Sequence, residues 1–205
     1  MTDVRLARHD EVGELAGVLA RAFVHDPFYA YLAGDASEPT QRMRDGWTGI
    51  IRFTSDNLST TYTTDDRAGV ALWHPPGYHG ASFIGSLRLL PSVLRLAGGL
   101  RRLREVSRAI EVLEDRRERH APVPHFYLSA LGVEPGRQGE GIGTALMQPI
   151  LERADSIGVP AYLETATARN VLLYERQGFG VVEELTLPGT DVHGWLMRRT
   201  PRRAV

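Results

Sequence analysis

Residues 126–167 read FYLSALGVEPGRQGEGIGTALMQPILERADSIGVPAYLETAT, and this stretch decides the fold. A strand-like apolar run at 126–133 is followed by a glycine-rich loop at 136–143 and a helical pattern over 144–157. A second strand-like run follows at 161–167. Because a crossover through a helix places two strands side by side and parallel, the stretch predicts an α/β domain.

The residues before this unit predict helices and a hairpin. A helical pattern follows a short N-terminal strand and is broken at Asp26-Pro27, and a second helix is predicted over 40–57. Strand-like runs at 60–64 and 69–73, joined by a short polar turn, predict an antiparallel hairpin. Leucines at helical intervals over 81–119 predict two or three further helices. Most of the arginines in that region are expected on a solvated helix face.

The residues after the unit predict a short helix and a closing pair of strands. The helix runs over 170–177 and stops at Gly178, where a left-handed cap is favoured. The strands are predicted at 179–187 and 194–198. We therefore expect one α/β domain over residues 1–205, built on a mixed sheet.

The composition excludes several classes of protein. The chain has 205 residues, a formal net charge of -1 and no cysteine. Disulfides, thiolate metal sites and cysteine nucleophiles are therefore excluded, and no metal site is predicted. The near-neutral charge argues against a nucleic-acid partner, and no apolar run is long enough for a membrane span. With no apolar signal peptide at its charged N-terminus, we expect a cytoplasmic protein.

Three alternating glycines, Gly139, Gly141 and Gly143, stand immediately before a helical pattern. Backbone amides at a helix start lack intrahelical partners and lie at the positive end of the helix dipole, so they suit a diphosphate. Arg137 could add a charge-assisted contact. A merely flexible loop is one alternative, and a dinucleotide site is another, because Glu164 lies about twenty residues further on. The G-x-G-x-G spacing and the late position in the chain argue against the dinucleotide site.

Two motifs resemble the GCN5-related N-acetyltransferase (GNAT) superfamily: Gln138-x-x-Gly141-x-Gly143 after a strand, then Asn170-x-x-x-Tyr174-Glu-Arg-x-Gly178-Phe179. Residues 125–199 look most like its puromycin N-acetyltransferase-like members, and 25–120 match weakly. The resemblance implies the GNAT acyl-CoA N-acyltransferase fold, with a largely antiparallel twisted sheet flanked by helices. It also implies acetyl-coenzyme A (acetyl-CoA) as the cofactor, an acceptor-side half at about 1–120 and an acetyl-CoA-binding core at about 121–200.

The resemblance further implies a cofactor site. In this family the diphosphate lies on the loop corresponding to 138–144, and the pantetheine arm pairs like an extra strand with residues 131–133. The strands around Ala130 and Glu164 would splay apart to admit the thioester, and the amide near Leu131 would stabilise the developing oxyanion. The residues expected to bind the cofactor are Leu131, Gly132, Val133, Arg137, Gln138, Gly139, Glu140, Gly141, Ile142, Gly143, Thr144, Asn170, Tyr174 and Arg176.

The catalytic residues are expected to be Tyr174, Glu164 and His125. Tyr174 matches the family tyrosine that protonates the departing thiolate. The group that deprotonates the amine is left open. Glu164, on a strand that faces the slot, is the first candidate, and His125, at the start of the other strand, and a water chain are the alternatives. Without cysteine, direct transfer in a ternary complex is expected.

The acceptor is predicted to be an aromatic or amphiphilic primary amine of small size, bound near the first helix break. The residues expected to bind it are Phe23, His25, Asp26, Phe28, Tyr29, Tyr31 and Trp73. An aminonucleoside-type antibiotic is a candidate acceptor, which would make the protein a resistance enzyme. Two alternatives stay open, an acetyltransferase of protein lysines or N-termini and a non-catalytic acetyl-CoA sensor. Either a monomer or a homodimer is compatible with the family.

Overall fold

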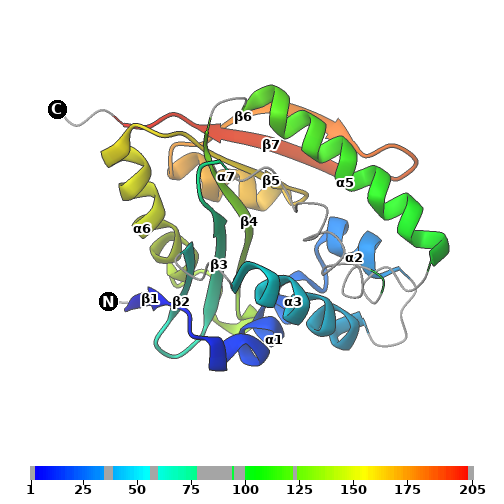
Figure 1. The fold of residues 1–205 in the computed structure, drawn as a ribbon, viewed down its shortest axis with the longest axis horizontal. Coiled ribbons are helices and arrows are strands. Elements are labelled where there is room, and N and C mark those ends of the chain that lie inside the picture. Colours follow the sequence, from blue (N-terminus) through cyan, green and yellow to red (C-terminus); the bar gives the residue numbers. More distant parts are fainter. Residues whose placement is uncertain are drawn as a thin grey trace.

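The computed structural model describes residues 3–34, 39–55, 60–77, 100–121 and 124–202, and residue 94. Within these ranges seven strands form one sheet in the order β1-β2-β3-β4-β5-β7-β6 (Figure 1). The strands are β1 Val4–Leu6, β2 Thr61–Thr64, β3 Gly69–His74, β4 Phe126–Val133, β5 Ala161–Thr165, β6 Gly180–Thr186 and β7 His193–Arg199. Apart from residue 94, the helices predicted over 81–99 lie outside the described residues.

Only one pair of neighbouring strands in this sheet is parallel. β4 and β5 run in the same direction, as the crossover through α6 (Ile142–Ile157) requires, so this prediction is confirmed. The predicted hairpin is β2–β3 and the predicted closing pair is β6–β7, and both are antiparallel. The fold is therefore the expected mixed α/β fold with a largely antiparallel sheet.

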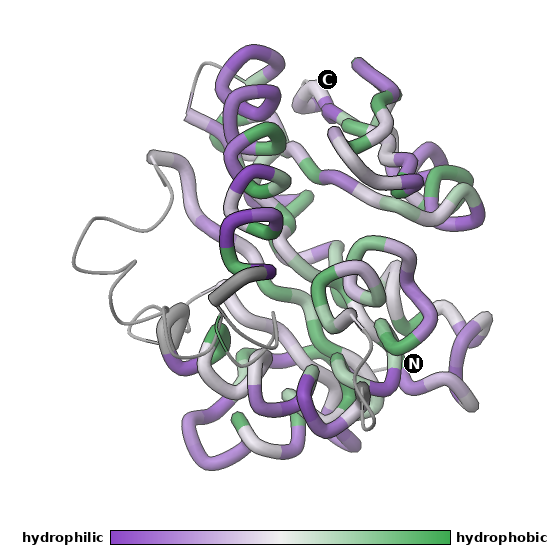
Figure 2. The backbone as a smooth tube through the Cα atoms, turned by 90° about the vertical axis from the view of Figure 1, so that its right-hand side faces the viewer, coloured by the Kyte–Doolittle hydropathy of each residue, from purple (hydrophilic) through white to green (hydrophobic). Residues whose placement is uncertain are grey.

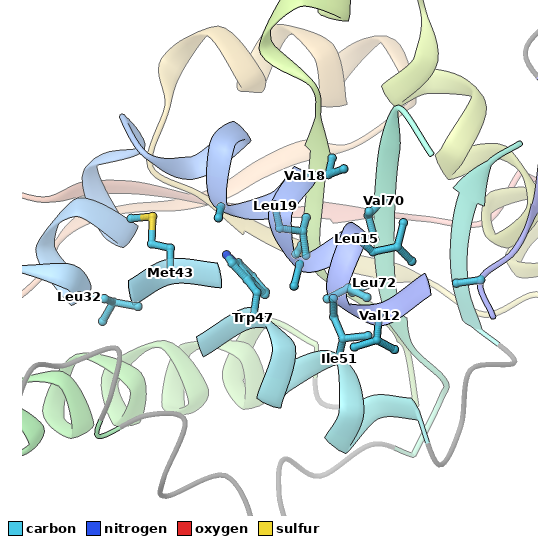
Figure 3. Packing of buried hydrophobic residues seen from close by; sticks show 14 of the residues in the cluster. Val12, Leu15, Val18, Leu19, Leu32, Met43, Trp47, Ile51, Val70 and Leu72 are labelled. Carbon is cyan, nitrogen blue, oxygen red and sulfur yellow. The ribbon is translucent and has the colours of Figure 1, made fainter. Parts of the chain in front are cut away.

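Helices α1 (Val12–Phe23) and α3 (Pro39–Ser55) pack over β3. Figure 3 shows Leu15 and Leu19 of α1 close to Trp47 of α3 and to Leu72 of β3, and all four side chains are buried. The apolar residues of α1 recur at helical spacing, so one stripe of the helix faces the sheet. This packing places the C-terminal end of α1 beside the middle of the sheet.

Helix α6 covers the opposite face of the sheet. The alternation along β3 shows this: Val70 and Leu72 join the cluster around α1, whereas Ala71 and Trp73 join the cluster around α6. Neighbouring residues of a strand point to opposite faces, so a strand without polar alternation is buried on both sides. Helix α7 (Ala168–Arg176) follows β5 on the α6 side, through residues such as Val171 and Tyr174.

Helix α5 (Leu100–His120) lies across β6 and β7 (Figure 1). Ala121, the residue directly after α5, packs with Tyr162 and Leu196, on the sheet face opposite to α6. Hydrophobic and hydrophilic segments alternate along this helix, which is the long one at the upper left of Figure 2. No helix in the described ranges combines the length and the apolar character that a bilayer crossing requires.

Helix α2 (Pro27–Ala33) begins at the position where the sequence predicts a helix break. Asp26 caps it: Oδ1 accepts hydrogen bonds from the amides of Phe28 at 3.0 Å and Tyr29 at 3.2 Å. Pro27 stands in the first turn, where its missing N–H costs nothing. The same short stretch therefore ends α1 and starts α2.

Candidate active site

The sheet opens between β4 and β5. Pairing of the two strands stops at Leu128 and Leu163, although both strands continue beyond these residues. A register shift in the β3–β4 ladder leaves Ser129 as an extra residue on β4, a β-bulge that bends the strand at this point. From Ala130 to the end of β4, one edge of the strand pairs with β3 and the other edge faces the opening.

The glycine-rich loop leads from the end of β4 into α6. Gly139 and Gly141 have φ angles of 92° and 82°, in the left-handed region that only glycine enters at low cost. Beyond each glycine and its two chain neighbours, no heavy atom of the described residues lies within 4 Å of the place that a Cβ would take, and no side chain of these residues caps α6. The first amides of α6 are therefore accessible from the side of the loop.

A cavity of about 600 Å³, here called the loop cavity, lies between this loop and α7. Arg169, which the sequence analysis missed, lines it together with the predicted Arg176. All predicted cofactor-binding residues except Glu140 line the loop cavity, namely Leu131, Gly132, Val133, Arg137, Gln138, Gly139, Gly141, Ile142, Gly143, Thr144, Asn170, Tyr174 and Arg176. The cavity thus joins the accessible amides to the open edge of β4.

Arg137 is already paired in the structure. Its guanidinium donates to Asp66 at 2.8 Å and to Glu140 at 2.7 Å. The Thr64 hydroxyl and then Arg137 lower the pKa of Asp66 to about 2. The prediction that Glu140 contacts the cofactor does not fit the structure. Its carboxylate accepts a hydrogen bond from Arg137, and it does not line the loop cavity.

A second cavity of about 100 Å³, here called the inner cavity, continues from the loop cavity into the opening of the sheet. Four predicted acceptor residues line it: Phe23, Asp26, Phe28 and Tyr29. Both cavities are lined by Phe23, Asp26, Leu131, Asn170 and Tyr174. These shared residues mark the junction at which the two cavities meet.

Asp26 connects two segments at this junction. While Oδ1 caps α2, Oδ2 accepts a hydrogen bond from the Thr167 hydroxyl at 3.1 Å. Burial raises the pKa of Asp26, against the opposing effect of these hydrogen bonds. The carboxylate thus ties the start of α2 to the loop between β5 and α7.

Glu164 lies one residue beyond the last β4–β5 pair and lines the inner cavity. Burial raises the pKa of Glu164 to about 7, against the opposing effects of the Tyr127 hydroxyl and the Arg117 guanidinium. Its Oε1 atom is inaccessible to solvent and has no hydrogen-bond partner among the described residues. A carboxylate of near-neutral pKa that lines a cavity is suited to act as a general base.

Arg117 and Tyr127 form the wall behind Glu164. The guanidinium carbon of Arg117 lies 4.6 Å from the centre of the Tyr127 ring. Burial raises the pKa of Tyr127 well above its ordinary value, so its hydroxyl stays protonated and able to donate. Arg117 is only 7% exposed, unlike the solvated arginines expected on this helix, because it shares a helix face with Leu113.

Tyr174 stands on α7 at the junction of the cavities and is 6% exposed. Its ring lies 6.0 Å from that of Phe179 in an edge-on contact, which fixes the side chain. Burial and the Asp26 carboxylate raise the pKa of Tyr174, so the hydroxyl stays protonated at neutral pH. A protonated hydroxyl at this position can donate a proton to a leaving group between the two cavities.

Two predicted residues lie away from both cavities because of their place on the sheet. Trp73 is fully buried in the cluster around α6, since β3 is covered on both faces. His125 precedes the first residue of β4, at the end opposite to the opening, and its ring contacts Tyr162 edge-on at 6.0 Å. Neither residue lines either cavity. The prediction that Trp73 binds the acceptor and the prediction that His125 is catalytic therefore do not fit the structure.

Two further predicted acceptor residues are displaced from the inner cavity. Tyr31 points toward α5, where the Arg102 guanidinium carbon lies 5.4 Å from its ring centre. His25 lines the loop cavity instead of the inner one. Both residues belong to the segment around the α1–α2 break. The sequence could not show which side chains of this segment face the inner cavity and which face elsewhere.

The structure also adds residues that the sequence analysis missed. These are Arg117 behind Glu164, Tyr127 in the inner cavity and Arg169 in the loop cavity. The aliphatic side chains that line the inner cavity and were missed include Leu113 of α5 and Leu185, Leu187 and Val192 of the β6–β7 hairpin. The helical spacing of Leu113 and Arg117 was a usable signal for a shared face, but no pattern in the sequence brings the hairpin to that helix.

Comparisons with known proteins show which family part of this chain resembles. Residues 99–179 match the family model of the acetyltransferase (GNAT) family. An uncharacterized N-acetyltransferase of Schizosaccharomyces pombe is 28% identical over 175 residues, which cover 80% of this chain and 68% of that protein.

Solved structures show the same fold over the whole chain. A structure described as histone acetyltransferase HPA2 and related acetyltransferase, from Corynebacterium glutamicum, has a TM-score of 0.71 at 19% identity and covers 100% of this chain and 99% of its own. The Drosophila melanogaster polyamine N-acetyltransferase has a TM-score of 0.64 at 18% identity and covers 97% and 98%. Residues 99–179 are thus similar to the GNAT family, and the chain shares the fold of these solved structures.

Proposed function

We propose that the protein transfers an acetyl group directly from acetyl-CoA to a primary amine of a small molecule. The proposal rests on the junction of the two cavities, where Tyr174 and Asn170 line both and Glu164 lies beside the opening of the sheet. Two reactants bound on either side of this junction would meet between a proton donor and a proton acceptor.

The loop cavity is the proposed site of acetyl-CoA, which supplies the acetyl group as an activated thioester. The accessible amides of the loop fit a diphosphate, and Arg169 and Arg176 add positive charge. The open edge of β4 at 131–133 offers backbone groups to an extended amide-bearing arm. In this proposal residues at about 121–200 form the acetyl-CoA-binding core and those at about 1–120 lie on the acceptor side.

The chain's own residues supply acid–base catalysis in this proposal. Glu164 accepts the proton that leaves the amine, so that a neutral nitrogen attacks. The backbone amide near Leu131 stabilises the negative charge that develops on the carbonyl oxygen, by roughly 3 kcal/mol in comparable sites. Tyr174 donates a proton to the departing sulfur. His125 has no part in this scheme, because it lines neither cavity.

The small volume of the inner cavity supports a small-molecule acceptor. The structurally similar Drosophila melanogaster enzyme is named for polyamines, which are amines of that kind. The Corynebacterium glutamicum structure is named for a histone acetyltransferase, so transfer to protein lysines or N-termini is the second candidate. An aminonucleoside-type antibiotic is the narrower proposal for the acceptor, and resistance would follow from it.

The proposal includes a cellular setting. We place the enzyme in the cytoplasm, as a monomer or homodimer, with acetyl-CoA and the amine as its partners and without a nucleic-acid or membrane partner. A non-catalytic acetyl-CoA sensor is the opposing case. Tyr174 at the junction and Glu164 in the inner cavity argue against it, because binding alone needs neither a proton donor nor a proton acceptor there.

The test is thiol release from acetyl-CoA by the purified protein, with simple alkylamines, puromycin and a lysine-containing histone peptide as acceptors. Release with the alkylamines or puromycin, but not with the peptide, is the expected result. Release with the peptide alone would assign the enzyme to proteins. Tight acetyl-CoA binding without thiol release for any acceptor would favour the sensor.

Tyr174→Phe tests the assigned proton donor. We expect kcat to fall by about 100-fold, while the Kd for acetyl-CoA changes by less than about twofold, because only a transition-state interaction is removed. Tyr62→Phe is the matched control, since Tyr62 lies on β2 and lines neither cavity. Full activity of Tyr174→Phe at neutral pH would remove Tyr174 from the mechanism.

A further inference from the structure

The inner cavity has a polar end and an apolar end. Glu164 and Asp26 are the two carboxylates that define its polar end, and Asp26 also lines the loop cavity. The apolar end lies between α5 and the β6–β7 hairpin, and its four aliphatic side chains are Leu113, Leu185, Leu187 and Val192. Leu187 and Val192 are at most 8% exposed, and Leu113 and Leu185 pack against the same small cluster.

The polar end has room for one positive charge. Asp26 already accepts hydrogen bonds from two amides of α2 and from the Thr167 hydroxyl. Glu164 is the other carboxylate, and its Oε1 atom has no partner among the described residues. No further carboxylate stands among the described residues that line this cavity. An ammonium group therefore finds its counter-charge at Glu164 and nowhere along the aliphatic walls.

The volume limits what can occupy the apolar end. The inner cavity measures about 100 Å³. Apolar cavities of about 150 Å³ in other proteins stay dry and bind a single benzene molecule. One branched alkyl group or one small ring therefore fits next to the amine of an acceptor, and the remainder of a larger acceptor has to lie outside.

Resting on the proposed acetyl transfer, we infer that the acceptor is a primary amine with one charge, joined by a short chain to one compact apolar group that Leu113, Leu187 and Val192 bind. The amine meets Glu164, and the apolar group lies between α5 and the hairpin. A second ammonium in this position would lose its hydration without gaining a counter-charge, which is strongly unfavourable. The acceptor site thus extends into the C-terminal hairpin, beyond the predicted acceptor-side half.

Isopentylamine and putrescine provide the first comparison, because both have six heavy atoms and differ in the second charge. Thiol release is measured with each, and with ethylamine, which carries the amine without the apolar group. We expect kcat/KM for isopentylamine to exceed the values for the other two by about 10-fold or more. Equal or higher kcat/KM for putrescine, or equal kcat/KM for ethylamine, would overturn the inference.

Calorimetric titration of isopentylamine into the protein saturated with CoA separates this inference from the proposed function. Binding without turnover of any amine would keep the apolar subsite and reject catalysis. Turnover of putrescine or ethylamine without a preference for isopentylamine would keep catalysis and reject the subsite. Neither binding nor turnover would reject both.

Leu113→Ala tests the aliphatic wall directly. We expect kcat/KM for isopentylamine to fall by about 10-fold, while kcat/KM for ethylamine changes by less than about twofold. Val112→Ala is the matched control, because Val112 packs against the same cluster from the same helix but does not line the cavity. Thermal unfolding of both variants shows whether each still folds.

Val192→Phe provides a second variant that fills the cavity instead of emptying it. Its kcat/KM for isopentylamine should fall below that for ethylamine, because the phenyl ring takes the place of the apolar group. Equal losses for the two amines in both Leu113→Ala and Val192→Phe would mean that these side chains only support the fold, and would overturn the inference.

Discussion

Glu164 shows how the surroundings of one side chain set its ionisation. Burial favours the neutral acid and raises the pKa of Glu164 to about 7, while the hydroxyls of Tyr127 and Tyr162 and the charge of Arg117 favour the carboxylate. Asp26, Tyr29 and Glu114 are further ionisable groups in its surroundings. Because a base works only when deprotonated, kcat/KM should rise with pH and reach half of its maximum near pH 7.

Arg117→Met should move this rise to higher pH. Removing a positive charge near a buried carboxylate raises its pKa, here by roughly one unit. The pH profile of kcat/KM, measured from about pH 5.5 to about pH 9, reports the shift. Arg119→Met is the matched control, because Arg119 lies on the same helix but is exposed and paired with Asp115 at 3.2 Å.

Glu164→Gln should abolish the same rise and lower kcat/KM by about 100-fold or more. A profile of unchanged shape in Glu164→Gln would assign the base elsewhere. A profile of unchanged shape in Arg117→Met, with Glu164→Gln inactive, would leave the base in place and show that Arg117 does not tune it.

Some residues of the site could be predicted from the sequence and others could not. Tyr174 and Glu164 were predicted because they stand at fixed places relative to a recognisable motif, although their roles remain proposals. Arg117 was missed, because an arginine in a charged helix is solvated unless tertiary packing covers it. Trp73 was misplaced, because a strand buried on both faces carries no alternation that tells one face from the other.

The loop and α6 form an element whose backbone is part of the proposed site. Gly141→Ala should raise the Kd for CoA by about 10-fold, since alanine resists the φ of 82° and the displaced amides would no longer converge. The measurement is isothermal titration with CoA.

Gly189→Ala is the matched control for this substitution. Gly189 also has a positive φ, of 75°, and open space at its Cβ position, but it lies in the β6–β7 turn and not on the loop cavity. Both variants should lose about 1 kcal/mol of stability. A similar change in CoA affinity for both would mean that strain acts through the fold as a whole.

Elements were predicted best where chain-local signals decide them. The strands at 126–133 and 161–167, the helix between them and the β2–β3 hairpin were all anticipated, with ends that differ by one or two residues. The sequence did not predict helix α2, because Asp26-Pro27 followed by aromatic residues was interpreted as a helix break. The same two residues also fit the start of a helix, as an N-cap followed by a first-turn proline. Only the packing of Leu32 and Ala33 decides between a helix break and a helix start.

At the scale of the whole molecule, the two cavities are built from segments far apart in the chain. The inner cavity takes Phe28 from α2, Leu113 from α5 and Val192 from the last hairpin. Hydrophobic periodicity reports which face of an element is buried but not which element covers it. The order β5-β7-β6 and the course of α5 over it therefore could not be read from the sequence, and the apolar end of the acceptor site was missed with them.

Acetyl-CoA should stabilise the whole fold, because its proposed cavity touches α1, β4, α6 and α7 together. At a concentration of about 100 times its Kd, a ligand that binds only the folded state adds about 2.7 kcal/mol. For a chain of this length the expected rise in Tm is roughly 5 to 10 °C, measured by scanning calorimetry.

NADH at the same concentration is the control for the dinucleotide alternative and should leave Tm unchanged. A larger rise with NADH than with acetyl-CoA would replace the proposed cofactor by a nicotinamide.

The separation of β4 from β5 also allows ligand binding to be measured by hydrogen exchange. On β4 beyond Leu128, the N–H groups that point away from β3 lie on an edge without a neighbouring strand, so they should exchange with deuterium quickly, while those bonded to β3 exchange slowly. A ligand bound along that edge would slow the exchange of the N–H groups that point away from β3 and leave the exchange of those bonded to β3 unchanged. Occupancy could then be followed from a few amide signals, even for an acceptor whose identity is unknown.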